Sequence, residues 1–211
     1  MTDTKKPKRI RITTPRGVLV FPHLNKPDTK FKPEGDYRTK LRMPEEDAKP
    51  LIDKLQPMLD AVVAKAQKDS KRKGKKLKVN DFYTPCFDDN GDATGDVEFN
   101  FKMQASGVRA DGTKWTAKPD LFDAHGQPMP ADVAIWSGTV ARVAFEVGEY
   151  DKPIGIGLSL RLSAVQVIRL VSSGQRDASA YGFGNEDDGE GDEESAGEGG
   201  SEAGGEGGVE F

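Results

Sequence analysis

An alternation of apolar and polar residues with a period of two recurs along most of the chain and constrains its fold more than any other feature. The segment 36–43, DYRTKLRM, places every second residue from Tyr37 to Met43 on one face and three cations on the other. The segments 97–103, VEFNFKM, and 156–162, IGLSLRL, alternate in the same way. Successive side chains of a strand point to opposite faces, so these runs predict half-buried strands. Shorter runs at 9–13, 16–21 and 142–147 predict three more strands.

One segment among the strands has helical spacing instead. Residues 44–70 carry Leu51, Leu55 and Leu59 on one stripe, begin with proline and acidic residues, and end in lysines. They predict an inserted helix that is kinked or divided in two at Pro57. Many strands, one helix and no alternation of strand and helix indicate a mainly β domain, built as a small barrel or a sandwich.

The charges of the chain are distributed unevenly. Residues 71–78 form a basic loop with six Lys or Arg around one Gly, whereas residues 185–211 hold 11 of the 35 acidic residues, nine Gly and no Lys or Arg. The remaining 24 acidic residues face 31 Lys and Arg in residues 1–184, which gives this part a charge near +7. We therefore expect one basic domain over 1–184 and a disordered acidic tail over 185–211. Such a tail imitates a polyanion or only keeps the protein soluble.

No constellation of residues indicates catalysis or a metal. Cys86 is the single cysteine, which excludes an internal disulfide and a cysteine-based zinc site. His23 and His125 are far apart and have no nucleophile motif nearby. The carboxylates of residues 88–96 do not keep the register of a calcium loop and predict a solvated hairpin turn. Without such motifs we expect a protein that is no enzyme and has no cofactor. The chain has no long apolar run, so we expect it to be cytoplasmic.

Cations and aromatic residues occur together in the basic part. Single-stranded nucleic acid is held by Lys and Arg at its phosphates and by aromatic rings on which its bases stack. Phe31 lies between Lys30 and Lys32, and Trp115 follows Lys114 after a predicted turn. These two rings are either stacking platforms or ordinary packing residues, and the sequence leaves both readings open.

The segment 118–170 resembles the corresponding stretch of the bacteriophage single-stranded DNA-binding proteins of the short-tailed coliphage replication type. The matching elements are KP and Asp from 118 to 123, SG and AR from 137 to 142, and GIGL at 155–158 followed by VQ at 165–166. An acidic tail ending in an aromatic residue, Phe211, is similar as well. The glycine content of the tail and the enlarged basic loop depart from the family's pattern.

The resemblance implies an OB fold, a five-stranded Greek-key barrel, that coats single-stranded DNA in phage replication and recombination without catalysis. It implies that the tail recruits the phage DNA polymerase and helicase-primase, through Asp192, Glu193, Glu194, Glu210 and Phe211. An OB barrel presents one strand face and its rim loops to nucleic acid. The expected phosphate contacts are Arg38, Lys40, Arg42, Lys102, Arg109, Lys114, Lys118 and Arg161, with Phe31 and Trp115 stacking on bases.

Three other functions stay open at this point. A duplex-binding architectural protein would use the same cations without exposed aromatic rings. A metal-dependent nuclease would need the carboxylates of residues 88–96 to bind a divalent ion. A pure interaction module would act through the acidic tail alone. Whether the protein forms a homo-oligomer is also open.

Overall fold

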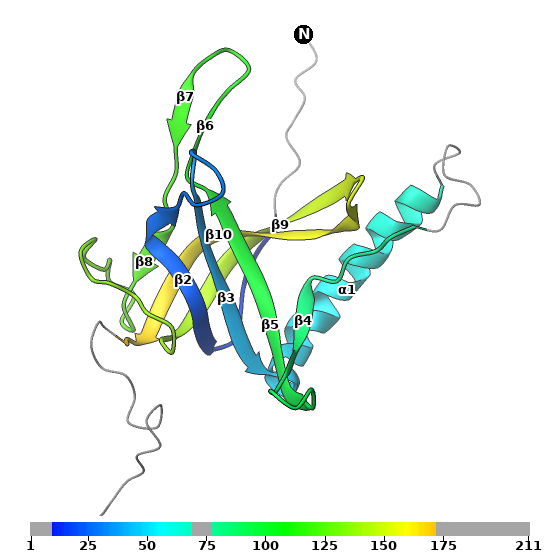
Figure 1. Cartoon of the computed structure of the whole chain (residues 1–211), viewed down its shortest axis with the longest axis horizontal. Helices are drawn as coiled ribbons and strands as arrows, with labels where there is room; N and C mark the ends of the chain where they lie inside the picture. The colour runs from blue at the N-terminus through cyan, green and yellow to red at the C-terminus, as the bar shows by residue number, and fades with distance from the viewer. Residues whose placement is uncertain (1–9, 69–76, 172–211) are drawn as a thin grey trace, which may run out of the picture. The chain divides into compact units, whose positions relative to one another are not determined.

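The computed structural model describes residues 10–68 and 77–171, and Figure 1 shows their course. They belong to the first of two units into which the chain divides, Met1–Gln175 and Arg176–Phe211. The acidic tail, its boundary at 184/185 and most of the basic loop lie outside the described residues, so those expectations stay predictions.

The described residues form ten strands and one helix. In chain order these are β1 (Arg11–Thr13), β2 (Gly17–Asp28), β3 (Asp36–Pro44), α1 (Glu45–Gln67), β4 (Tyr83–Phe87), β5 (Ala93–Gln104), β6 (Ser106–Val108), β7 (Lys114–Thr116), β8 (Asp120–Phe122), β9 (Val140–Lys152) and β10 (Gly155–Arg169). Strands β6 and β7 pair only with each other, as a hairpin that projects from the barrel (Figure 1).

Five of the strands close into a barrel. Strand β2 pairs with β3, β3 with β5, β5 with β10, β10 with β9, and β9 returns to β2. All of these ladders are antiparallel except that between β5 and β10. In chain order the five strands therefore follow the sequence 1-2-3-5-4-1 around the barrel, which is the Greek-key closure of an OB fold. The predicted fold class is confirmed.

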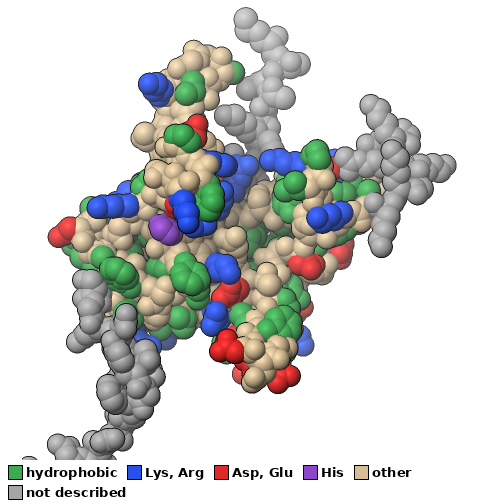
Figure 2. Space-filling model, viewed as in Figure 1, with side chains coloured by type: hydrophobic (Ala, Val, Ile, Leu, Met, Phe, Trp, Pro, Cys, Tyr) green, Lys and Arg blue, Asp and Glu red, His purple; other side chains and the backbone are tan. Residues whose placement is uncertain are grey.

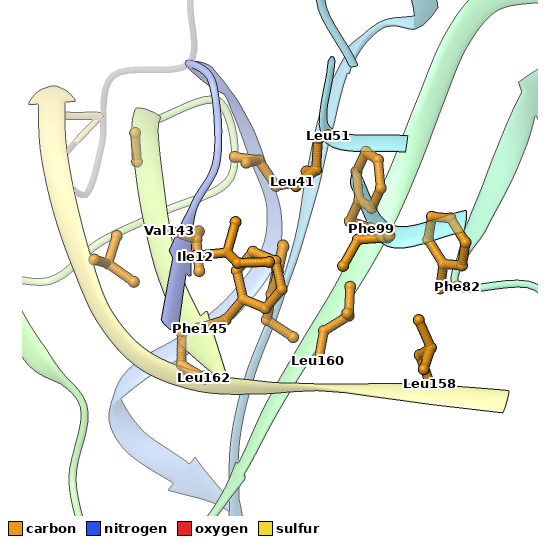
Figure 3. Close-up of a cluster of buried hydrophobic side chains, with 14 of the residues drawn as sticks. Ile12, Leu41, Leu51, Phe82, Phe99, Val143, Phe145, Leu158, Leu160 and Leu162 are labelled. Carbon is orange, nitrogen blue, oxygen red and sulfur yellow. The ribbon is translucent and has the colours of Figure 1, made fainter. Parts of the chain in front are cut away.

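The barrel interior is filled by the residues that the alternation placed on the inner faces. Phe99, Phe101 and Phe145 are fully buried, and their ring centroids form a chain with separations of 6.5 Å and 5.0 Å. Figure 3 shows Phe99 and Phe145 among the side chains that β1, β3, β5, β9 and β10 point into the core. Complete burial of one large apolar side chain contributes about 1.5–3 kcal/mol, so each of these three rings contributes substantially to the stability of the barrel.

Helix α1 closes one side of the barrel. Its buried stripe includes Leu51, Leu55 and Leu59, which join the same hydrophobic cluster as the strands. Of the two outcomes predicted at Pro57, a division of the helix is wrong, because one helix runs without a break from Glu45 to Gln67, and a kink stays a prediction. Pro57 lies on the exposed face. Pro57 has no N–H to donate to the Asp53 carbonyl, and Asp53 is an exposed residue as well.

Candidate nucleic-acid interface

A row of basic side chains crosses the outer face of the barrel. In the strand registers His23 of β2 lies opposite Arg38 of β3, Arg38 lies opposite Lys102 of β5, and Lys102 lies opposite Arg161 of β10. Directly opposite residues point to the same face, so the four side chains form one line. We call Arg38, Lys102 and Arg161 the cation row, and His23 lies at its β2 end. With neighbouring strands about 4.8 Å apart, the row is about 10 Å long.

Two further cations lie on β3 beside this row. Lys40 and Arg42 follow Arg38 at every second position and are exposed. Figure 2 shows the Lys and Arg side chains gathered over β3, β5 and β10, below the projecting β6–β7 hairpin. The structure thus brings five predicted phosphate contacts to one face, namely Arg38, Lys40, Arg42, Lys102 and Arg161.

Three carboxylates that the sequence analysis did not select lie beneath these cations. Asp28 is 2.5 Å from Arg38 and Asp36 is 2.8 Å from Lys102. Glu98 accepts hydrogen bonds from both remaining cations of β3, at 2.7 Å from Lys40 Nζ and 2.7 Å from Arg42 Nη2. The carboxylate side chains are 10–12% exposed, whereas the cations above them are 42–49% exposed. Each of these four cations is therefore anchored from below and accessible from above.

The pKa values follow from this arrangement. Burial raises the pKa of Glu98, but the hydrogen bonds and charges of Lys40 and Arg42 outweigh burial and leave it below its usual value. The hydrogen bond to Glu98 raises the pKa of Arg42 in return. The pKa of Asp28 is lowered chiefly by a hydrogen bond from the backbone N–H of Lys30, and Arg38 adds to this. Glu98 and Asp28 are hence ionised at neutral pH and offset part of the positive charge of Lys40, Arg42 and Arg38.

The β6–β7 hairpin carries three more predicted contacts. Arg109 begins its turn, whose Gly112 has a positive φ of 82° and donates its N–H to the Arg109 carbonyl. Lys114 is exposed, and Trp115 is half-buried. The indole of Trp115 lies on Gly107, because a Cβ added to that glycine would be 2.9 Å from it. One face of Trp115 is thus covered by its own hairpin.

The other two predicted contacts lie near the base of that hairpin. Lys118 lines a surface hollow of about 430 Å³ together with Tyr37 of β3 and Thr116 of β7. Phe31 is 76% exposed in the loop between β2 and β3, and the Lys30 ammonium lies 5.6 Å from its ring centroid. The loop after the first barrel strand is one of the two loops through which OB folds bind oligonucleotides.

Besides Phe87 of β4, which is 61% exposed, two exposed aromatic residues were not selected by the sequence analysis. Phe21 of β2 is 71% exposed and Trp136, in the segment before β9, is 51% exposed. Neither has the flanking lysines that singled out Phe31 and Trp115. The signal that could have found Phe21 is the proline that follows it, Pro22, since proline inside a strand marks an edge or a bulge.

The acidic segment 88–96 has a structural role in the described part of the chain. Asp88 Oδ1 accepts hydrogen bonds of 2.9 Å from the backbone N–H groups of Asn90 and Asp92, which closes the turn between β4 and β5. Across residues 10–68 and 77–171, no group of three metal-ligating side chains comes together. Over the same ranges no helix is long and apolar enough to cross a membrane.

Solved structures of two phage proteins share this fold. One is gp2.5, a single-stranded DNA-binding protein encoded by bacteriophage T7, at 19% identity and a TM-score of 0.65, covering 85% of this chain and 97% of that one. The other is the single-stranded DNA-binding protein of bacteriophage Enc34 in complex with single-stranded DNA, at 15% identity and a TM-score of 0.50, covering 78% and 89%.

The sequence comparisons decide the family. No curated protein sequence matches the chain. A family model does match, over residues 17–170, and its description is the single-stranded DNA-binding protein of bacteriophage T7. The matched range begins at the first residue of β2 and ends just after β10, so it spans the whole barrel. The chain therefore belongs to the T7-type family of phage single-stranded DNA-binding proteins.

Proposed function

We propose that this chain binds single-stranded DNA without catalysis and coats it during phage DNA replication and recombination, in the cytoplasm of the infected host. The observation that carries the proposal is the family match, which spans the entire barrel and with it the cation row. Because the row is built on the rigid strands β3, β5 and β10, its charges are held in place before DNA arrives. Phosphate contacts of this kind are independent of sequence.

The carboxylates under the cations give the site a specific mechanism. A phosphate that approaches Lys40, Arg42 or Lys102 meets a cation that already has an internal anion, Glu98 or Asp36. The DNA must therefore share or replace that anion. Binding is weaker than the formal charge of the face predicts, and strands exchange more readily, which suits a protein that must be cleared ahead of a polymerase.

The acidic tail adds a second competitor to this proposal. We assign the DNA-binding domain to residues 1–184 and the tail to 185–211, whose 11 carboxylates compete with DNA for the same cations. DNA then releases the tail, and its end at Phe211 becomes available to the phage DNA polymerase and helicase-primase. Deleting residues 185–211 should raise the affinity for DNA, most clearly at low salt, and abolish capture of the polymerase.

Deleting Phe211 alone separates the two roles of the tail. Nearly all the acidic charge remains in that variant, so DNA affinity should change little while polymerase capture falls. Equal DNA affinity of the full-length and tail-less proteins at low salt would contradict competition by the tail.

A titration with three labelled nucleic acids tests the central function. The protein should bind single-stranded DNA in preference to a duplex of the same length, and RNA is the third probe. Preference for the duplex would indicate an architectural protein instead. Degradation of the probe that depends on a divalent ion and stops with chelator would indicate a nuclease. Loss of all binding on removing the tail would indicate an interaction module.

A further inference from the structure

Strand β2 contains a bulge beside the cation row. Val20 lies opposite Lys40 and His23 lies opposite Arg38, so β2 advances three residues where β3 advances two. One extra residue on one strand is the definition of a β-bulge, which bends the strand and redirects a side chain. The redirected residue here is Phe21.

The bulge turns Phe21 away from the core. Leu19 is fully buried on the inner face, and unbroken alternation would place Phe21 on that face as well. Instead Phe21 is 71% exposed, with a φ of 48°, and it is the one non-glycine residue in the described part of the chain with a positive φ. Non-glycine residues occupy this region rarely, and such strain is concentrated at functional sites.

A second aromatic residue is held next to the bulge. The backbone N–H of Phe21 donates a 2.9 Å hydrogen bond to Ser137 Oγ. The backbone N–H of Gly138, one residue further, donates to the Leu19 carbonyl at 3.0 Å. These bonds fix the segment that carries Trp136, whose side chain is 51% exposed, against β2.

We propose that Phe21 and Trp136 form a base-stacking site for single-stranded DNA at the edge of the cation row. This inference rests on the proposed function and adds the residues that hold the bases. The bulge lies opposite the part of β3 between Arg38 and Lys40, so a strand whose phosphates lie on these cations has its bases within reach of Phe21. In Figure 2 apolar side chains are exposed over β2, next to the Lys and Arg side chains of the face.

Bases fit this place better than a second copy of the chain. Stable protein interfaces have a core depleted of charge, whereas this site adjoins the charged side chains of Arg38 and Lys40. An exposed aromatic ring beside cations is suited to single-stranded DNA, whose phosphates bind the cations while its flat bases stack on the ring. A homodimer through this face is an alternative outcome that the test below separates.

The test compares Phe21→Ala and Trp136→Ala with the control Phe87→Ala. Phe87 is a phenylalanine whose exposure of 61% lies between those of Trp136 and Phe21, and it lies opposite Ala93 at the far end of β5 from Lys102. Each site variant should weaken binding of oligo-dT by about 5- to 150-fold, the range for one lost base contact, and the control should not. The salt dependence should stay unchanged, since no cation is removed.

An abasic strand of the same length provides the discriminating probe. Wild type and both variants should bind it equally, because stacking contributes nothing without bases. Phe21→Trp should restore oligo-dT binding. Sedimentation and thermal melting of each variant exclude a changed oligomer or a loss of fold.

The outcomes separate this inference from the proposed function. If wild type binds oligo-dT and both site variants bind it as tightly, the stacking site is refuted and the function stands. If wild type does not bind single strands at all, the proposed function itself fails. If wild type is a dimer, a site variant is a monomer, and both bind oligo-dT with the same affinity per chain, the face belongs to a second copy of the chain. That result would also overturn the inference.

Discussion

Glu98→Gln tests most sharply how the carboxylates act under the interface. Glu98 accepts hydrogen bonds from Lys40 and Arg42, and its side chain is 10% exposed. Glutamine keeps the shape of the side chain and removes its charge. If Glu98 competes with phosphate, the variant should bind single-stranded DNA more tightly than wild type. If Glu98 instead positions the two cations for DNA, the variant should bind more weakly.

The size of the effect follows from the number of cations released. Two cations that each gain a phosphate add up to about 1.4 to the slope of log K against log salt. Lowering the salt from about 200 to 50 mM then strengthens binding by up to about sevenfold more in the variant than in wild type. The gain should be greatest at low salt, where charges are screened least.

The same substitution should destabilise the fold. Loss of a buried, hydrogen-bonded charge costs about 1–3 kcal/mol, toward the lower end here because Lys40 and Arg42 are about half exposed and can be solvated. Urea unfolding measures this cost, and fluorescence titration with oligo-dT at four salt concentrations measures the slope. Asp60→Asn on α1 is the control for a general change of charge. An unchanged slope and affinity in folded Glu98→Gln protein would refute competition.

Three further predictions concern stability and binding. The folded-state pKa values of Glu98 and Asp28 lie below their unfolded values, so the stability that they contribute is complete above about pH 5 and is lost as the pH falls through the folded-state values. Melting temperatures between pH 7 and 3 should therefore show a smaller loss for Glu98→Gln than for wild type. Gly157→Ala places a Cβ 2.6 Å from the Tyr150 hydroxyl and should cost about 1–3 kcal/mol in urea unfolding, and an unaffected variant would show that this contact relaxes freely. Trp115→Ala should weaken single-strand binding by about 1–3 kcal/mol, whereas a lower melting temperature with normal binding would make Trp115 a packing residue.

The inner faces of the strands could be predicted from the sequence because alternation reports burial directly. Leu41, Met43 and Phe99 are buried as their positions predict. The helix was predictable for the same reason, because Leu51, Leu55 and Leu59 recur at helical spacing and are buried. Strands β6 to β8 have three residues each, too short for any period to be visible.

The cation row could be predicted only in part. Each cation was visible on the outer face of its own strand, but the alignment of Arg38, Lys102 and Arg161 depends on the registers between strands. Asp28 and Asp36, which pair with Arg38 and Lys102, were missed for that reason. Which residues face one another across strands depends on the strand registers and cannot be read from the sequence alone. Glu98 lay on the predicted outer face, and nothing local marked it as a partner of β3.

Phe21 shows where alternation fails. One extra residue in β2 reverses the face of the side chain, and a pattern of period two cannot register such an insertion. Phe31 and Trp115 were selected by a different criterion, the lysines that flank them, and this criterion has its own weakness. Flanking charge says nothing about what covers a ring, and Trp115 has one face on Gly107.

The salt dependence of single-strand binding by a variant of the cation row tests the central claim most directly. Arg38, Lys102 and Arg161 are replaced together by glutamine, and the control replaces Lys49, Lys54 and Lys68, exposed residues within or at the end of α1. If the row holds the phosphates, the slope of log K against log salt should fall in the row variant and stay unchanged in the control. The fall should lie between about 0.7, if Asp28 and Asp36 already neutralise Arg38 and Lys102, and about 2, if all three cations count in full. Equal slopes in the row variant and wild type, with both proteins folded, would contradict the claim that the face formed by β3, β5 and β10 binds the DNA.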